Sequence, residues 1–588
     1  MYRLHRKRRN MKALLVAINA KYIHSNLAVY NLKAYADANS GEKDSGTIRI
    51  AEYTINNQTM SILEGIYREK PDLLCFSCYI WNITMVEELI AEYHKLCPDV
   101  PIWVGGPEVS YEVETFLEEH PEVTGIMMGE GEKTFCEVYR YYQGYGESLA
   151  EIDGIAYHRG TEIAITKARA VMDMDEIPFC YGHIEDFKNK IIYYETSRGC
   201  PFRCSYCLSS VEKQLRFRSF SLVKKELAYF LEKEVAQVKF VDRTFNCDHK
   251  HAMEVWSFIK EHDNGITNFH FEISADLLTE EELALLASMR PGLVQLEIGV
   301  QSTNDATITE IHRTMQLNRL KETVRAVQKG QNIHEHLDLI AGLPYEDYKR
   351  FGISFDDIYA LKPNQLQLGF LKVLKGSYMY EHAQEYGICY RSRAPYEVLQ
   401  TKWLTFDDVI AIKQVEEMLE VYYNSGQFEL TIKLLEPLFD SAFAMYQEFG
   451  RFYERNGYFA MSHSRIRRSE ILLEFMTERG IDGETKQLLQ ESLIYDLYLR
   501  ENCKSRPVWV DNLSEWKAVS RAYVTGGKQN HVERFHYHFP GKEVKTVTSL
   551  PERLKEPCYL LFDYTKRDPL DHQAAVTECD GRVSDEQK

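Results

Sequence analysis

The sequence lacks long apolar segments and an excess of positive charge. None of its apolar runs approaches the roughly twenty residues that a transmembrane helix needs, so we expect no membrane partner. Lys and Arg number 70 against 88 Asp and Glu, which gives a formal net charge of −18. This acidic balance argues against broad electrostatic binding of nucleic acid, although a local basic groove stays open.

Internal repeats and low-complexity tracts are also absent, which excludes a solenoid and long disordered linkers. A length of 588 residues permits about three or four domains. The apolar run after the basic residues 1–10 is too short for a signal peptide, so we expect those ten residues to be a flexible extension or a misassigned start. Thirteen cysteines without a secretory signal fit a reducing compartment, and we expect a cytoplasmic protein.

Three of the cysteines form a tight motif. Cys200, Cys204 and Cys207 have the spacing C-x3-C-x2-C and follow a predicted strand at 191–196. Three thiolates in one loop suit three corners of a [4Fe–4S] cluster, and the fourth iron is then open to the amino and carboxylate groups of S-adenosylmethionine (SAM). A zinc site, a disulfide and a chance placement of buried cysteines are the alternatives. A zinc site would need a second cysteine pair, and none lies nearby.

The first part of the chain, residues 11–145, alternates short apolar strands with amphipathic helical patterns. This alternation predicts a doubly wound parallel sheet, in which ligands bind outside the carboxyl ends of the strands. Gly, small polar and aromatic residues gather at those ends, in the segments 19–26, 77–82, 105–108 and 129–132. The predicted strands are 12–18, 48–53, 72–78, 101–105 and 124–128.

Residues 146–190 read as a linker with a β-hairpin, and residues 191–380 form a second alternating region. Six strand–helix units predict a curved, incomplete β/α barrel with its site at the carboxyl ends of the strands. Residues 381–575 predict a helical domain with a β-rich tail, and we expect the last ten residues to be disordered. The predicted barrel strands are 191–196, 237–242, 268–274, 293–299, 335–341 and 366–371; the predicted helices of the last domain are 405–423, 428–449 and 483–499, and its strands 532–539 and 558–564.

Together these motifs resemble those of the radical SAM enzymes with a cobalamin-binding domain, in the subfamily with an uncharacterised C-terminal domain. The resemblance rests on the cysteine motif with an aromatic residue, Tyr206, before its last cysteine, and on four later segments: VDRTFN (241–246), LEIGVQS (296–302), LDLIAGLP (337–344) and LGFLKVLKGS (368–377). It implies an α/β fold with a flavodoxin-like cobalamin-binding domain, a partial (β/α)6 barrel and a mainly helical C-terminal domain with a small β tail.

The resemblance also implies roles for particular residues. The three cysteines would ligate the [4Fe–4S] cluster, and the candidate SAM contacts are Asp242, Glu297, Gln301, Ser302, Asp338 and Gly342. Glu297 and Gln301 alternate along one predicted strand and therefore share a face; a solvated strand edge is the alternative. Arg216 and Arg218 would pair with a carboxylate such as that of SAM, or carry surface charge.

The N-terminal domain departs from the best-known cobalamin-binding pattern, D-x-H-x-x-G. The corresponding loop reads NAKYIHSNLA, in which His24 lacks both the Asp and the Gly, so a structural role is favoured over cobalt ligation. The candidate cobalamin contacts are Ser77, Trp81, Asn82, Gly105, Gly106 and Glu130.

The resemblance implies reductive cleavage of SAM, most plausibly for cobalamin-dependent C-methylation of an unknown small molecule, peptide or RNA, with flavodoxin or ferredoxin as electron donor. Three alternatives stay open: a cobalamin-dependent cyclisation or rearrangement, a methylthiotransferase, and a cobalamin or redox sensor without enzymatic activity. A methylthiotransferase would need a second cluster, for which Cys75, Cys78, Cys97 and Cys136 are available, but Cys75 and Cys78 fit packing roles better.

Two further motifs carry weaker signals. The basic stretch 462–470 suits phosphate binding or a solvated helix start, and His536 and His538 share a strand face without a third metal ligand nearby.

Overall fold

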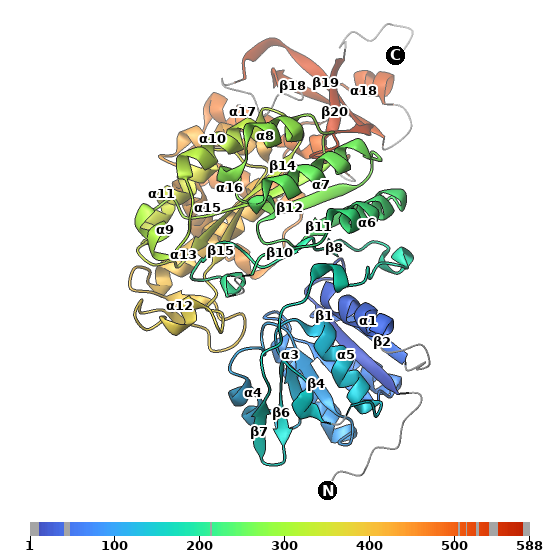
Figure 1. The fold of residues 1–588 in the computed structure, drawn as a ribbon. Helices are drawn as coiled ribbons and strands as arrows, with labels where there is room; N and C mark the ends of the chain where they lie inside the picture. The colour runs from blue at the N-terminus through green and yellow to red at the C-terminus, as the bar shows by residue number, and fades with distance from the viewer. Residues whose placement is uncertain are drawn as a thin grey trace.

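The computed structural model describes residues 11–39, 47–146, 148–211, 214–503, 506–512, 514, 516–524, 529–539 and 551–579. The expectations for residues 1–10 and for the polar C-terminal end lie outside this range. Figure 1 shows the N-terminal domain at one end, the barrel in the middle and the C-terminal domain behind and beyond the barrel. No helix in the described part of the chain is long and apolar enough to cross a membrane.

The N-terminal domain contains the predicted doubly wound sheet. Its five parallel strands have the order β2-β1-β3-β4-β5, and helices cover both faces (Figure 1). Because both faces are covered, β1 is buried along almost its whole length. The strands are β1 (Lys12–Asn19), β2 (Thr47–Thr54), β3 (Leu73–Ser77), β4 (Ile102–Gly105) and β5 (Gly125–Met127); the helices are α1 (Leu27–Asn39), α2 (Thr59–Glu69), α3 (Ile83–Leu96), α4 (Val113–Glu119) and α5 (Gly131–Tyr142).

The predicted β-hairpin is present, at residues 155–165. Its strands, β6 (Ile155–Arg159) and β7 (Glu162–Ile165), do not stand in a linker but extend the N-terminal sheet, because β6 pairs antiparallel with β5. The hairpin thereby covers the edge of β5, which would otherwise expose unpaired backbone groups. Two short 3-10 turns, at Met174–Glu176 and Ile184–Phe187, then lead to the barrel.

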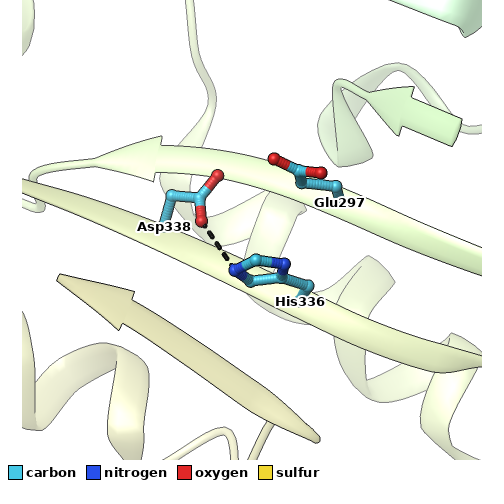
Figure 2. A group of neighbouring side chains, drawn as sticks. All are labelled: Glu297, His336 and Asp338. Carbon is cyan, nitrogen blue, oxygen red and sulfur yellow. Dashed lines mark ion pairs between the residues drawn. The ribbon is translucent and has the colours of Figure 1, made fainter. Parts of the chain in front are cut away.

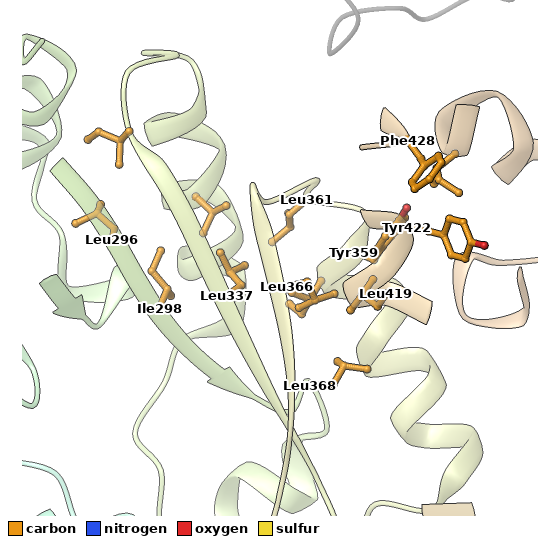
Figure 3. Close-up of a cluster of buried hydrophobic side chains, with 14 of the residues drawn as sticks. Leu296, Ile298, Leu337, Tyr359, Leu361, Leu366, Leu368, Leu419, Tyr422 and Phe428 are labelled. Atoms are coloured by element: carbon orange, nitrogen blue, oxygen red, sulfur yellow. The ribbon is translucent and has the colours of Figure 1, made fainter. Parts of the chain in front are cut away.

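The barrel is an open sheet of six parallel strands in the order β15-β14-β13-β12-β11-β8, so the predicted incomplete barrel is confirmed. Leu296, Ile298 and Leu337 point from the strands to the surrounding helices (Figure 3). The strands are β8 (Ile192–Tyr194), β11 (Gln237–Phe240), β12 (Asn268–Ile273), β13 (Val294–Gln301), β14 (His334–Ala341) and β15 (Gln365–Phe370); the helices are α6 (Phe220–Glu232), α7 (His249–Glu261), α8 (Glu280–Ala287), α9 (Asp305–Glu310), α10 (Leu317–Gln328) and α11 (Tyr348–Tyr359).

The C-terminal domain shares one apolar core with the barrel: Tyr359 of α11 packs near Leu419 and Tyr422 (Figure 3).

The predicted helix 428–449 is wrong, because Pro437 lies in a 3-10 turn (Glu436–Leu438) that separates two helices. The elements are α12 (Tyr378–Glu381), β16 (Cys389–Tyr390), β17 (Val398–Gln400), α13 (Phe406–Leu419) with a π-helical turn (Glu420–Asn424), α14 (Glu429–Leu435), α15 (Ala442–Arg455), α16 (Arg465–Glu478), α17 (Gly483–Arg500), α18 (Lys517–Tyr523) and an antiparallel sheet of β18 (Asn530–Tyr537), β19 (Arg553–Arg567) and β20 (Ala574–Cys579).

A buried carboxyl group makes the stability of this core depend on pH. Glu335 of β14 is fully buried, and burial raises its pKa to about 8, which the Gln328 side chain opposes only in part. In the unfolded chain this carboxyl group loses its proton near pH 4.5. Between about pH 5 and pH 8 the folded chain therefore keeps a proton that the unfolded chain has lost, and the free energy of unfolding falls by roughly 1.4 kcal/mol per pH unit. We therefore expect Glu335→Gln to raise the melting temperature at pH 8 and to leave it nearly unchanged at pH 4.5. The exposed Glu322→Gln on α10 is the control, and an equal shift at both pH values would contradict the interpretation.

Candidate functional site

The three cysteines lie on one loop that a short ladder closes. Ser197 and Arg198 of β9 (Ser197–Arg198) pair antiparallel with Phe217 and Arg216 of β10 (Arg216–Phe217), and the loop between these strands carries all three thiols. Gly199 begins the loop with φ +90°, and a Cβ atom there would lie 2.5 Å from the Gln214 carbonyl oxygen, so only glycine fits. We call the described residues between these strands, 199–211, 214 and 215, the cysteine loop.

The thiols of the cysteine loop differ in exposure. Cys204 is buried, whereas Cys200 and Cys207 are partly exposed, and all three are free. A fourth thiol, Cys247, lies close enough to be affected by Cys200: burial, assisted by Cys200, raises its pKa to about 11. Cys247 follows β11 in the chain and lies outside the C-x3-C-x2-C motif.

Asp242 holds the segment that leads into the cysteine loop by hydrogen bonds. Its buried carboxylate accepts hydrogen bonds from the Thr196 backbone amide at 3.0 Å, the Thr196 hydroxyl at 2.6 Å and the Ser197 hydroxyl at 2.6 Å. Burial raises the pKa of Asp242 to about 6 against the effect of these bonds. In this structure the carboxylate holds the strand that leads into the loop, and its predicted contact with SAM stays a prediction.

Sequence reasoning missed Arg313, which lies against the cysteine loop. Its Nη1 atom is 3.8 Å from Cys204 Sγ and 3.4 Å from the Tyr206 hydroxyl, and Nη2 donates to the Gly299 carbonyl oxygen. Burial raises the pKa of Cys204, whereas the guanidinium lowers it and so favours the thiolate. No local pattern distinguishes this arginine from a surface arginine; only the fold places it beside the cysteines.

The inner face of the barrel sheet is polar. Glu297, Gly299 and Gln301 alternate with buried apolar residues along β13, so their predicted common face is confirmed. Glu297 Oε2 accepts from Lys239 Nζ and His270 Nε2, both at 2.8 Å. Burial would raise the pKa of Glu297, but His270 and Lys239 outweigh it and hold the pKa below its ordinary value. The alternative of a solvated strand edge is therefore wrong.

Next to this group, His336 and Asp338 of β14 form an ion pair (Figure 2). His336 Nε2 lies 3.1 Å from Asp338 Oδ1, and Glu297, His336 and Asp338 offer ligand atoms within 4.8 Å of one another. Lys239 already supplies positive charge to Glu297, so the group does not require a metal ion. Glu272, whose pKa burial raises to about 7, lies 3.9 Å from Lys239. Lys239, His270, Glu272 and His336 were not predicted, because they come from strands far apart in the sequence.

The remaining predicted SAM residues surround the upper end of β13. Gln301 has φ 73° and lies at a register shift, which turns its backbone away from the regular ladder. The buried Ser302 donates to Glu346 at 2.7 Å. Gly342 has φ +93°, and a Cβ atom there would lie 2.7 Å from Val398 Cγ1. Ser302 and Gly342 thus have structural roles, and their ligand contacts stay predictions.

The candidate cobalamin residues lie at the predicted edge of the N-terminal sheet. Asn82 is buried and donates to the Ile18 and Ser77 carbonyl oxygens at 3.0 and 2.9 Å. Trp81 also donates to Ile18, and its ring stacks on Tyr79 at 4.3 Å while 42% of the residue remains exposed.

Gly105 is the last residue of β4, and Gly106 next to it adopts φ +118°, where a Cβ atom would lie 2.4 Å from the Cys78 carbonyl oxygen. Of the predicted set, Asn82 and Gly106 therefore shape the edge and Trp81 is available to a ligand.

Three predicted groups are bound within the protein. His24 Nδ1 lies 2.6 Å from the Tyr193 hydroxyl, which supports the structural role. Arg216 binds Glu130, and the buried Arg218 binds Glu226. Both arginines are therefore paired with protein carboxylates and neither is free surface charge. The contact of Glu130 with cobalamin stays a prediction.

The weaker motifs are structural too. In the basic stretch, Arg465 pairs with Glu501 at 3.0 Å and Arg467 with Glu474 at 2.7 Å, so these charges are neutralised. His536 Nδ1 lies 2.9 Å from Glu491. Cys75, Cys78 and Cys136 are buried in the N-terminal domain, in agreement with packing roles, and Cys97 is partly buried.

Comparison with known proteins adds three matched regions. Residues 13–139 match the B12 binding domain, residues 194–358 the radical SAM superfamily, and residues 384–548 a domain described as a protein of unknown function, DUF4080. The chain is 26% identical over 316 residues to the cobalamin-dependent radical SAM methyltransferase TokK of Streptomyces tokunonensis, an alignment that covers 48% of this chain and 44% of TokK. The chain thus spans less than half the length of that relative.

Two solved structures share the fold. The cobalamin-dependent S-adenosylmethionine radical enzyme OxsB aligns with a TM-score of 0.57 at 16% identity, over 83% of this chain and 80% of OxsB. The radical S-adenosylmethionine methyltransferase TsrM of Kitasatospora setae aligns with a TM-score of 0.55 at 16% identity, over 66% of this chain and 80% of TsrM. The order of an N-terminal doubly wound domain followed by a partial barrel is therefore confirmed as a fold.

The position of Arg313 leads to a prediction about SAM. A buried guanidinium beside the cysteine loop suits the SAM carboxylate, and a charged hydrogen bond of this kind contributes about 1.5–3 kcal/mol. We expect Arg313→Met to weaken SAM binding about 10- to 100-fold in equilibrium dialysis, with iron content unchanged. Arg319→Met on α10 is the control, because Arg319 is also a partly buried arginine of the barrel but donates to the Leu278 carbonyl oxygen. Unchanged SAM affinity in Arg313→Met would contradict the assignment.

Proposed function

We propose that this chain, which carries regions matching the B12 binding domain, the radical SAM superfamily and DUF4080, is a cobalamin-dependent radical SAM enzyme that methylates carbon. The observation that carries the proposal is the closed cysteine loop: three free thiols on one loop, inside the radical SAM region and beside the B12-binding region. A non-enzymatic sensor would not need this loop together with a polar barrel interior.

The residues fit a [4Fe–4S] cluster with one open iron. Cys200, Cys204 and Cys207 would hold it, and Arg313 favours the thiolate of Cys204. When bound, the cluster supplies an electron to SAM, and cobalamin carries the methyl group. The enzyme's own residues bind the cluster and the cofactors, orient them and exclude water from around them.

SAM would lie between the cysteine loop and the inner face of the barrel. Arg313 would bind its carboxylate, and the polar inner-face residues Glu272, Glu297 and Asp338, with Gln301 above them, would accept hydrogen bonds from its ribose hydroxyls and amino group. Lys239 and His270 hold Glu297 in one orientation, so this acceptor is fixed before SAM arrives. The apolar outer face of the same strands anchors them to the helices.

Cobalamin would lie against the edge formed by Ser77, Trp81, Asn82, Gly105 and Gly106. The exposed Trp81, held by its hydrogen bond to Ile18, offers a flat apolar surface. His24 is bound to Tyr193, so cobalt would have no His24 ligand while that hydrogen bond persists.

Methyl transfer is preferred to the alternatives on specific grounds. A methylthiotransferase would need a second cluster, but Cys75, Cys78 and Cys136 are buried and burial raises the pKa of all three thiols. Similarity to a cobalamin-dependent methyltransferase favours methylation over rearrangement. We further propose a cytoplasmic enzyme that receives electrons from a flavodoxin or ferredoxin and acts on a small molecule, peptide or RNA.

The test of this function is cleavage of SAM. The reconstituted enzyme, reduced with dithionite, is expected to form 5′-deoxyadenosine and methionine from SAM, measured by mass spectrometry. Cys204→Ala should lose the visible absorption of the cluster and the cleavage together, because two thiolates hold a cluster poorly. Cys136→Ala, which removes a buried cysteine outside the cysteine loop, is the control. If Cys204→Ala still cleaved SAM, the cluster assignment would be wrong.

A further inference from the structure

A buried ion-pair cluster ties the cysteine loop to the N-terminal domain. Arg198 and Arg216 stand side by side at the base of the loop, because they are paired residues of the β9–β10 ladder. Arg198 binds Glu132 and Glu195 and lies 3.3 Å from Glu130, and Arg216 binds Glu130 with both Nη atoms. Glu130 and Glu132 lie at the start of α5, on the ligand edge of the N-terminal domain.

This cluster is not an ordinary surface network. The exposed fraction of its five side chains is at most 18%, and that of Glu132 is 6%. Buried charges persist only where their partners are complete and well oriented, and two arginines with three carboxylates meet that condition through bidentate bonds. A guanidinium that binds two carboxylates in one plane also fixes direction, which a lysine would not do.

The cluster joins groups that the chain places far apart. Glu130 and Glu132 are about 66 residues before Arg198, yet they contact both ends of the cysteine loop. Glu195 extends the cluster to α1, because Asn31 Nδ2 donates to Glu195 Oε1 at 3.0 Å. The ligand edge of the N-terminal domain and the base of the cysteine loop are therefore joined by direct contacts.

We propose that Glu130 and Glu132 are positioning residues for the iron–sulfur cluster: through Arg198 and Arg216 they set the cysteine loop relative to the ligand edge of the N-terminal domain. This inference rests on the proposed function. Glu130 thus acts on the cysteine loop through Arg216. Without Glu132, the three thiolates would still bind iron, but the cysteine loop would no longer hold the open iron in a fixed position relative to Arg313, which contacts the loop at Cys204.

The test uses the full chain, reconstituted anaerobically with iron, sulfide and hydroxocobalamin. Glu132→Gln keeps the size of the side chain and removes its charge. We expect iron content to be retained, SAM affinity to fall about tenfold or more, and the SAM-induced change in the electron paramagnetic resonance spectrum of the reduced cluster to become weak and heterogeneous. Glu137→Gln is the matched control, because Glu137 lies on the same helix and binds Arg169 within the N-terminal domain.

A second pair of variants separates positioning from folding. Arg198→Lys keeps the charge and loses the bidentate geometry, so its spectrum should be intermediate between that of the unchanged chain and that of Arg198→Met. If Glu132→Gln does not fold, as judged by its melting curve, Arg216→Lys is compared with the unchanged chain by the same two readouts.

The outcomes are distinct. If Glu132→Gln folds, binds iron and cobalt, and shows the same SAM affinity and the same spectrum as the unchanged chain, the positioning role is overturned and the proposed function is left intact. Absence of iron from the unchanged chain after reconstitution would overturn both. A tenfold loss of affinity in Glu132→Gln but not in Glu137→Gln supports the inference.

Discussion

The site depends on the closure of the cysteine loop at its base. The ladder that closes it has only two residue pairs, and a pairing of this length is marginal by itself. The surrounding structure therefore fixes both strands: Asp242 holds the end of β8 from below, and Arg198 and Arg216 are held by carboxylates from the side. The geometry of three thiols thus rests on contacts from the barrel, from the N-terminal domain and from the segment between them.

The alternation of the barrel strands provides the second part of the site. Apolar residues such as Leu296 and Ile298 pack outward against helices, and the same strand presents Glu297 to the inside. Closed β/α barrels fill their interior with branched apolar side chains, whereas here charged residues occupy it. Their burial is offset by pairing, as between Glu297 and Lys239, so that the interior stays polar without isolated charges. An open, polar interior is what a water-soluble cofactor such as SAM requires.

Much of this arrangement could be predicted from the sequence, because it depends on local patterns of residues. The strand periodicity located the sheets, and the cysteine spacing located the loop. The hairpin itself was found, but its pairing with the N-terminal sheet was missed, because the contact between β5 and β6 is not encoded in the hairpin. The break at Pro437 shows that apolar periodicity alone does not define a helix. Arg313 and the partners of Arg198 could not be found, since their roles arise from contacts between segments about 66 to 109 residues apart. The assignment of Arg216 to a ligand carboxylate was wrong in partner but right in chemistry, because its partner is Glu130.

The most direct test of the account is a count of metals. The chain is purified without oxygen, reconstituted with iron and sulfide in the presence of hydroxocobalamin, desalted, and analysed for iron and cobalt together with its visible spectrum. The account predicts about four irons and about one cobalt per chain, with the broad absorption of a [4Fe–4S] cluster. A chain that retains cobalt but no iron would contradict the central claim that the cysteine loop holds a cluster.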